Sequence, residues 1–118
     1  KVHPYRYGSA DDHIADLRVP TGPGPHPVAV LIHGGFWRDH WARDSMEGIA
    51  VDLGGHGWAT WNLEYHRVGS GGGWPATLED VATGIDHLTT AAAVTRWIYP
   101  DYTVYFEHQN VVEVVVHR

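Results

Sequence analysis

The sequence predicts an α/β fold built on a mostly parallel sheet with helices on both faces. Residues 28–32 (VAVLI) are apolar without alternation, which is typical of a strand buried on both faces, and residues 58–63 are a second strand candidate. Apolar residues at helical spacing follow each run, at about 44–53 and 75–88. This alternation of strand and helix is the order expected of parallel strands joined by covering helices.

Length and composition describe one small domain with its own core. The chain has 118 residues, and 43% of them are hydrophobic. Its formal charge is −6, from 8 basic and 14 acidic residues. A nucleic-acid or anionic-membrane surface needs clustered Lys and Arg, so we expect no nucleic-acid and no membrane partner.

The N-terminal residues 1–27 are expected to form short extended segments. Residues 14–19 alternate apolar and polar side chains, the period of a half-exposed strand. Residues 20–27 contain four prolines and two glycines, so we expect a surface turn there.

Each of the two predicted helices has an apolar face. Residues 44–53 should end at the Gly54-Gly55 pair, and residues 75–88 should begin at Pro75, after a glycine-rich loop over 65–73. The residues expected to be buried are Met46, Ile49, Ala50 and Leu53 on the first helix, and Leu78, Val81, Ala82, Ile85 and Leu88 on the second.

The end of the chain has a different character. Residues 102–107 and 111–117 are two β-rich runs joined by only three residues, the pattern of an antiparallel hairpin.

A chemically informative motif follows the first buried strand, where the chain continues as His33-Gly34-Gly35-Phe36-Trp37. Glycines at a strand end let the backbone turn sharply. Backbone N–H groups fixed in such a loop can hold the oxyanion of an acyl-transfer intermediate. A glycine pair by itself is equally compatible with an ordinary turn.

Three segments in order, PVAVLIHGGFW, WATWNLEYHR and GGWPATLEDVATGIDHL, resemble the N-terminal half of α/β-hydrolase-fold esterases. The group includes hormone-sensitive-lipase-type carboxylesterases and arylformamidase-like enzymes, and the likeness spans about residues 5–90. It implies hydrolysis of a small-molecule carboxylic ester or amide, with an oxyanion hole at Gly34, Gly35 and Phe36. Trp37 and Tyr65 would then contact substrate or pack in the core, and packing is the more frequent role of such aromatics.

The nucleophile of that family has no counterpart in this sequence. The family places a G-x-S-x-G turn after the second helix, and no such motif occurs here. Of the three serines, Ser9, Ser45 and Ser70, only Ser70 has a glycine on both sides, and it belongs to the flexible loop. No catalytic residue is therefore assigned. We expect an incomplete hydrolase, as from a truncated or rearranged gene.

Residues 1–96 are thus expected to be part of a hydrolase domain, and residues 97–118 a hairpin tail of separate origin. The tail bears a weaker likeness to the terminal hairpin of RelE/ParE-type toxins, which leaves a toxin-like fusion as a minor alternative. A structural hypothesis is that the tail covers the open sheet edge beside residues 28–32, within the chain or between two chains. A non-catalytic binding or dimerisation module is the alternative to the hydrolase.

Neither a metal site nor a cofactor is predicted. The ten histidines are scattered without an H-E-x-x-H motif or paired-ligand spacing, and there is no cysteine. No signal peptide or membrane-length apolar run is visible, so we expect a soluble, cytoplasmic protein.

Overall fold

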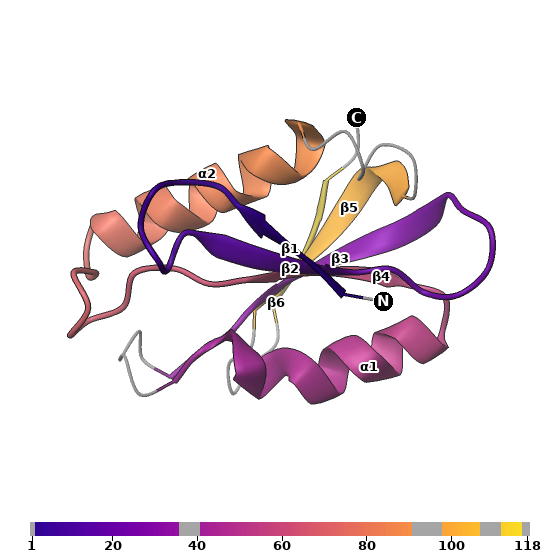
Figure 1. The fold of residues 1–118 in the computed structure, drawn as a ribbon, viewed down its shortest axis with the longest axis horizontal. Helices are drawn as coiled ribbons and strands as arrows, with labels where there is room; N and C mark the ends of the chain where they lie inside the picture. Colours follow the sequence, from indigo (N-terminus) through magenta and orange to yellow (C-terminus); the bar gives the residue numbers. More distant parts are fainter. Residues whose placement is uncertain (1, 36–40, 91–97, 107–111, 117–118) are drawn as a thin grey trace.

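The described residues form one six-stranded sheet with a helix on each face (Figure 1). The computed structural model describes residues 2–35, 41–90, 98–106 and 112–116. The sheet order is β1-β2-β4-β3-β5-β6. The elements are β1 (Val2–Arg6), β2 (Ile14–Arg18), β3 (His26–Ile32), a 3-10 turn η1 (Arg43–Met46), α1 (Glu47–Gly55), β4 (Ala59–Leu63), α2 (Ala76–Thr90), β5 (Ile98–Phe106) and β6 (Val112–Val116).

The central strand β3 is buried on both faces, as its uninterrupted apolar run predicts. Val28, Val30 and Ile32 pack into the core on the α2 side. Ala29 and Leu31 pack on the opposite side against the region of η1 and α1. Parallel neighbours flank β3, with β4 on one side and β5 on the other. The predicted α/β fold with helices on both faces is confirmed. The sheet is mixed and not mostly parallel, because the N-terminal strand pair and the tail strand join it antiparallel.

The N-terminal prediction is confirmed with a small change of boundary. In β2, Ala15 and Leu17 are fully buried while the alternate positions are half-buried. β2 pairs antiparallel with β1 and with β4, so it brings the N-terminal strands to one edge of the sheet. β3 begins at His26, two residues before the predicted start, which shortens the turn.

The predicted buried face of the first helix is wrong at Ile49, which is exposed. Met46 and Ala50 are buried and Leu53 packs beside them, a row spaced four and three residues apart. This narrow row suffices to contact the sheet, and Ile49 lies outside it. The helix also continues through Gly54 and Gly55.

The predicted face of the second helix is wrong at Leu78 and Ala82, both exposed. The buried row is Thr77, Val81, Gly84 and Leu88. Gly84 decides how the helix is rotated about its axis, because this position faces the sheet closely. A Cβ there would lie 2.3 Å from Leu63 Cδ1. The Trp61 indole N–H donates to the Gly84 carbonyl at 3.1 Å. The helix therefore approaches β4 through its glycine.

The tail forms the hairpin that its sequence predicts and extends the main sheet. β5 pairs antiparallel with β6, and it also pairs in parallel with β3 from His26 to Ile32. The hypothesis that the tail covers the edge of residues 28–32 is confirmed, within one chain. In the described part of the chain, no helix combines the length and apolar character needed to cross a membrane.

Candidate functional site

The glycine loop, which begins at His33, follows the carboxyl end of β3. The carboxyl end of β4 lies beside it. β3 and β4 are parallel, and Ile32 lies opposite Leu63 in their register. The next residues, His33 and Glu64, are therefore neighbours in space although 31 positions separate them. The carboxyl ends of parallel strands are where α/β proteins place their sites.

His33 and Glu64 form a buried pair at this edge. His33 Nε2 lies 2.6 Å from Glu64 Oε1, and the two side chains are 0% and 2% exposed. The other ring nitrogen, Nδ1, lies 3.0 Å from the carbonyl oxygen of Gly34. The ring thus connects the glycine loop to the end of β4.

Tyr65 holds the same histidine from a third direction. Its hydroxyl donates to the His33 carbonyl at 2.5 Å, and its ring stacks on the imidazole with centroids 4.4 Å apart. Tyr65 is completely buried. This burial favours packing over contact with substrate as the role of Tyr65.

Two arginines surround the Glu64 carboxylate. The backbone N–H of Arg43 donates to Oε2 at 2.9 Å, and the Arg43 and Arg67 guanidinium groups lie 3.7 and 3.6 Å from the carboxylate. Burial acts to raise the pKa of Glu64, but the hydrogen bonds from His33 and Arg43 and the charges of His33 and Arg67 together lower it below its usual value. Glu64 is therefore held as a carboxylate inside the protein.

The backbone of Glu64 has a buried partner as well. The Tyr7 hydroxyl donates to the Glu64 carbonyl at 2.5 Å, which connects the end of β1 to this edge. Burial raises the pKa of Tyr7 well above its usual value, and the nearby carboxylates Asp80, Glu64 and Asp12 raise it further. Tyr7 therefore acts as a neutral hydrogen-bond donor.

Gly35 needs to be glycine for two reasons. Its φ is +107°, a left-handed conformation that L side chains rarely adopt. A Cβ at this position would also lie 2.4 Å from the Trp41 ring. Of the other predicted oxyanion residues, Gly34 is half-buried beside His33, and Phe36 lies outside the described residues, as does Trp37. The described part of the loop is a sharp turn, and its first residue, His33, is held in place by Tyr65 and Glu64.

Ser70 occupies a closed turn, as expected of a loop residue. Its hydroxyl donates to the Arg67 carbonyl and accepts from the Arg67 N–H, both at 3.1 Å. The Ser70 N–H also donates to the Arg67 carbonyl at 2.9 Å. A hydroxyl engaged with its own turn is unlike a nucleophile aimed at a substrate.

A cavity of about 190 Å³ lies beside η1. It is lined by Asp16, Ala42, Arg43, Asp44, Glu47 and Asn62. Arg43 Nε donates to Asp16 Oδ2 at 2.8 Å, and the Asn62 amide N–H donates to the Arg43 carbonyl at 2.8 Å. These bonds fix η1 to β2 and β4.

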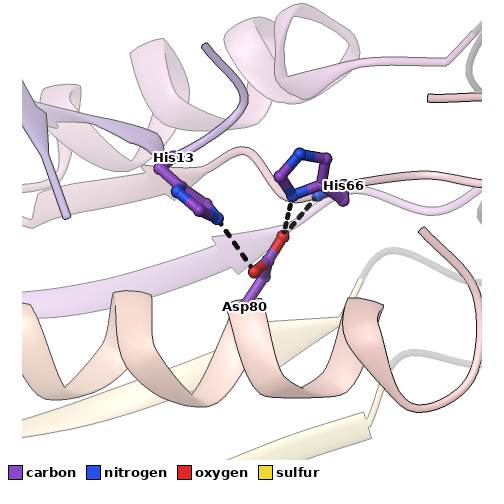
Figure 2. Close-up of side chains that lie close together, drawn as sticks. All are labelled: His13, His66 and Asp80. Atoms are coloured by element: carbon purple, nitrogen blue, oxygen red, sulfur yellow. Dashed lines mark hydrogen bonds and ion pairs between the residues drawn. The ribbon is translucent and has the colours of Figure 1, made fainter. Parts of the chain in front are cut away.

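Sequence spacing missed a second histidine–carboxylate group, the His13–Asp80–His66 cluster (Figure 2). His13 precedes β2, His66 follows β4, and Asp80 lies on α2. Asp80 Oδ1 lies 3.0 Å from His13 Nε2, and Oδ2 lies 2.7 Å from His66 Nδ1. Burial acts to raise the pKa of Asp80, but the hydrogen bonds from His66 and His13 outweigh it and lower the pKa. In the sequence, Asp80 belongs to the hydrolase-like segment GGWPATLEDVATGIDHL, which by itself indicates no pairing with histidine.

Comparison with known proteins identifies the architecture. The BD-FAE family model matches residues 15–97, which is more than half of the chain. No curated protein sequence matches the chain. The toxin-like interpretation of the tail finds no support in these comparisons.

Several solved esterase structures share the fold. Esterase B from Lactobacillus rhamnosis is 23% identical with a TM-score of 0.74, and a bacterial heroin esterase is 21% identical with a TM-score of 0.70. MGS-M1, an α/β-hydrolase enzyme from a deep-sea metagenome library of the Medee basin, is 17% identical with a TM-score of 0.65. The matches cover 89%, 90% and 90% of this chain, but only 35%, 34% and 45% of those proteins. The sheet is therefore a partial α/β-hydrolase fold.

Proposed function

The chain belongs to the BD-FAE family, and from this premise we propose that the loop after β3 is the oxyanion half of a serine-hydrolase site for a carboxylic ester or amide. Backbone N–H groups around Gly34, Gly35 and Phe36 would hold the negative oxygen of the tetrahedral intermediate. Trp37 would line the substrate side of the loop. The α/β-hydrolase fold and the esterase neighbours support this class of reaction.

The observation that carries the proposal is the fixed start of the loop. The Tyr65 hydroxyl holds the His33 carbonyl, and Glu64 holds the imidazole from a buried position. Gly35 then turns with a positive φ, and the Trp41 ring leaves no room for a Cβ at this position. Donors fixed before the reaction stabilise developing charge without reorganisation, which is what an oxyanion hole needs.

These 118 residues supply no nucleophile for the proposed site. The sequence contains no G-x-S-x-G motif, and the Ser70 hydroxyl is bound to its own turn. A working site needs a nucleophile and a base from elsewhere, in a longer chain or a second chain. We expect these residues alone to hydrolyse esters negligibly, since an oxyanion hole without a nucleophile retains a small part of the rate enhancement.

A titration followed by amide NMR tests the oxyanion role without requiring turnover. Methylphosphonate, a small mimic of the tetrahedral oxyanion, should shift the amide resonances of Gly34 and Gly35. Gly22 is the matched control, because it has φ of +97° in an exposed turn and should not move. Equal shifts at all three glycines, or none, would contradict the proposal.

Hydrolysis of p-nitrophenyl acetate tests whether the proposed hydrolase site lacks its nucleophile in this chain. Purified chain should give turnover no faster than a heat-denatured sample. Rapid turnover that is lost in Gly35→Trp would show a complete site and overturn this part of the proposal.

A second candidate function, a dimerisation module, is favoured by the position of β6. This strand has β5 on one side and forms one edge of the described sheet. An edge strand offers unpaired backbone groups to a second chain. Light scattering of the purified chain distinguishes the outcomes: a discrete dimer supports the module, whereas a monomer or polydisperse aggregate contradicts it.

A further inference from the structure

We propose that His13, His66 and Asp80 bind a divalent transition-metal ion of the Zn²⁺ class. One nitrogen from each histidine and one carboxylate oxygen all lie within 4.8 Å of one another (Figure 2). This site is separate from the glycine loop and does not depend on the proposed hydrolase function. It reverses the expectation of no metal site, which rested on spacing along the sequence.

The donor set suits zinc. Imidazole nitrogen and carboxylate oxygen are ordinary Zn²⁺ ligands, at bond lengths of about 2.0–2.2 Å, which places tetrahedral ligand atoms roughly 3.4 Å apart. The three side chains therefore need only short movements to surround an ion. Three protein ligands leave the fourth position for water.

Solvent reaches the His13–Asp80–His66 cluster, and its side chains already face one another. The side chains of His13, His66 and Asp80 are 22%, 25% and 15% exposed, so an ion can reach them from solvent. Both rings already point their nearer nitrogens at the Asp80 carboxylate. The backbone N–H of His66 also donates to Asp80 Oδ2 at 2.8 Å, and such a bond orients a ligating carboxylate.

The two histidines differ in what metal binding requires of them. The Ala10 N–H donates to His13 Nδ1 at 3.2 Å. A metal on Nε2 moves the ring proton to Nδ1, and two facing N–H groups cannot bond, so this contact must open. His66 coordinates through Nδ1 and carries its proton on Nε2. We therefore expect His66 to contribute more than His13, and the Ala10 amide to report binding.

Bound metal would connect three segments distant in sequence. These are the loop before β2, the loop after β4 and the second turn of α2. An ion that binds the folded chain alone raises its stability by mass action. The site is therefore expected to make the stability of this small domain depend on the metal.

Calorimetric titration of the untagged, chelator-treated chain with zinc chloride tests the proposal. We expect one ion per chain, a thermal midpoint that rises with zinc, and a shifted Ala10 amide resonance. His66→Gln should weaken binding by roughly tenfold or more. His56→Gln is the matched control, because His56 is an exposed histidine after α1 and should bind zinc as the unchanged chain does.

Circular dichroism establishes that each variant is folded before titration. If His66→Gln does not fold, His13→Gln on the other loop serves in its place. Equal zinc affinity in the unchanged chain and a folded cluster variant, or no binding at millimolar zinc, would overturn the proposal.

Discussion

Two histidine–carboxylate pairs lie at the same side of the fold but in different surroundings. His33–Glu64 is 0% and 2% exposed with a separation of 2.6 Å, whereas His66–Asp80 is 25% and 15% exposed with a separation of 2.7 Å. The contact geometry is nearly the same. What differs is the access of water to the charges.

That difference separates the roles of the pairs. A buried charge has lost its hydration, so removal of its partner leaves an uncompensated charge in a low-dielectric interior. Glu64 is therefore bound to its position and serves to fix the glycine loop. Asp80 has water nearby and can exchange its hydrogen bonds for other ligands, so the outer pair suits an ion site.

The largest effect is expected from Glu64→Ala. Loss of this carboxylate leaves His33, Arg43 and Arg67 without their shared partner, and we expect the free energy of unfolding to fall by about 3–5 kcal/mol. Urea unfolding followed by circular dichroism measures the change. Glu47→Ala is the control, since Glu47 pairs with Arg18 at a half-exposed position and should cost less than about 1 kcal/mol. Similar losses in both variants would show that burial does not distinguish them.

Gly35→Ala is expected to have the next largest effect, about 2–3 kcal/mol, from backbone strain together with overlap with Trp41. Gly22→Ala isolates the strain, because Gly22 also has a positive φ but no atom within 4 Å of an added Cβ, and it should cost about 1 kcal/mol. Urea unfolding of the two variants gives the difference due to Trp41. Equal costs would mean that the loop can move away from this ring.

Asp80→Asn should destabilise the chain by about 1–2 kcal/mol in the presence of a chelator, less than Glu64→Ala, because solvent partly replaces the lost charge interactions. Thermal and urea unfolding measure this. A loss as large as that of Glu64→Ala would contradict the contrast between the buried and the outer pair.

The smallest expected effect is on how the free energy of unfolding depends on acidic pH. The pKa values of Glu64 and Asp80 are lowered in the folded chain, so the unfolded chain binds more protons below about pH 4.5. The stability that these two carboxyl groups contribute is therefore constant near neutrality and is lost as the pH falls through their lowered pKa values. Each carboxyl contributes a slope of at most about 1.4 kcal/mol per pH unit.

Unfolding of Asp80→Asn between pH 7 and 3 should show a shallower acid slope than the unchanged chain. Identical slopes would contradict the lowered pKa of Asp80.

Local patterns predict the elements of this fold better than their faces. The run over 28–32 identifies β3 because a strand covered on both sides needs apolar side chains at every position. Their hydrophobicity predicts buried positions for Ile49, Leu78 and Ala82, yet all three are exposed. Helix rotation depends on contacts such as that between Gly84 and Leu63, which helical spacing cannot reveal.

The candidate site also combines residues that local sequence predicts with residues that it does not. The turn at Gly34 and Gly35 could be predicted, because glycines after a buried strand have a local meaning. The roles of Glu64 and Tyr65 could not, since each depends on the parallel register that places β4 beside β3. The His13–Asp80–His66 cluster needs two loops and a helix to meet, so no spacing along the chain indicates it.

Neighbouring residues encode the α/β class, the glycine turn after β3, the terminal hairpin and the absence of a G-x-S-x-G motif, so these features could be predicted without a structure. The fold was needed to show that β5 pairs with β3 within one chain, that Glu64 fixes His33 from inside the protein, and that two scattered histidines share Asp80. The physical reason is that pairing, burial and charge compensation join residues distant in sequence, and their energies depend on the surroundings that the whole fold creates.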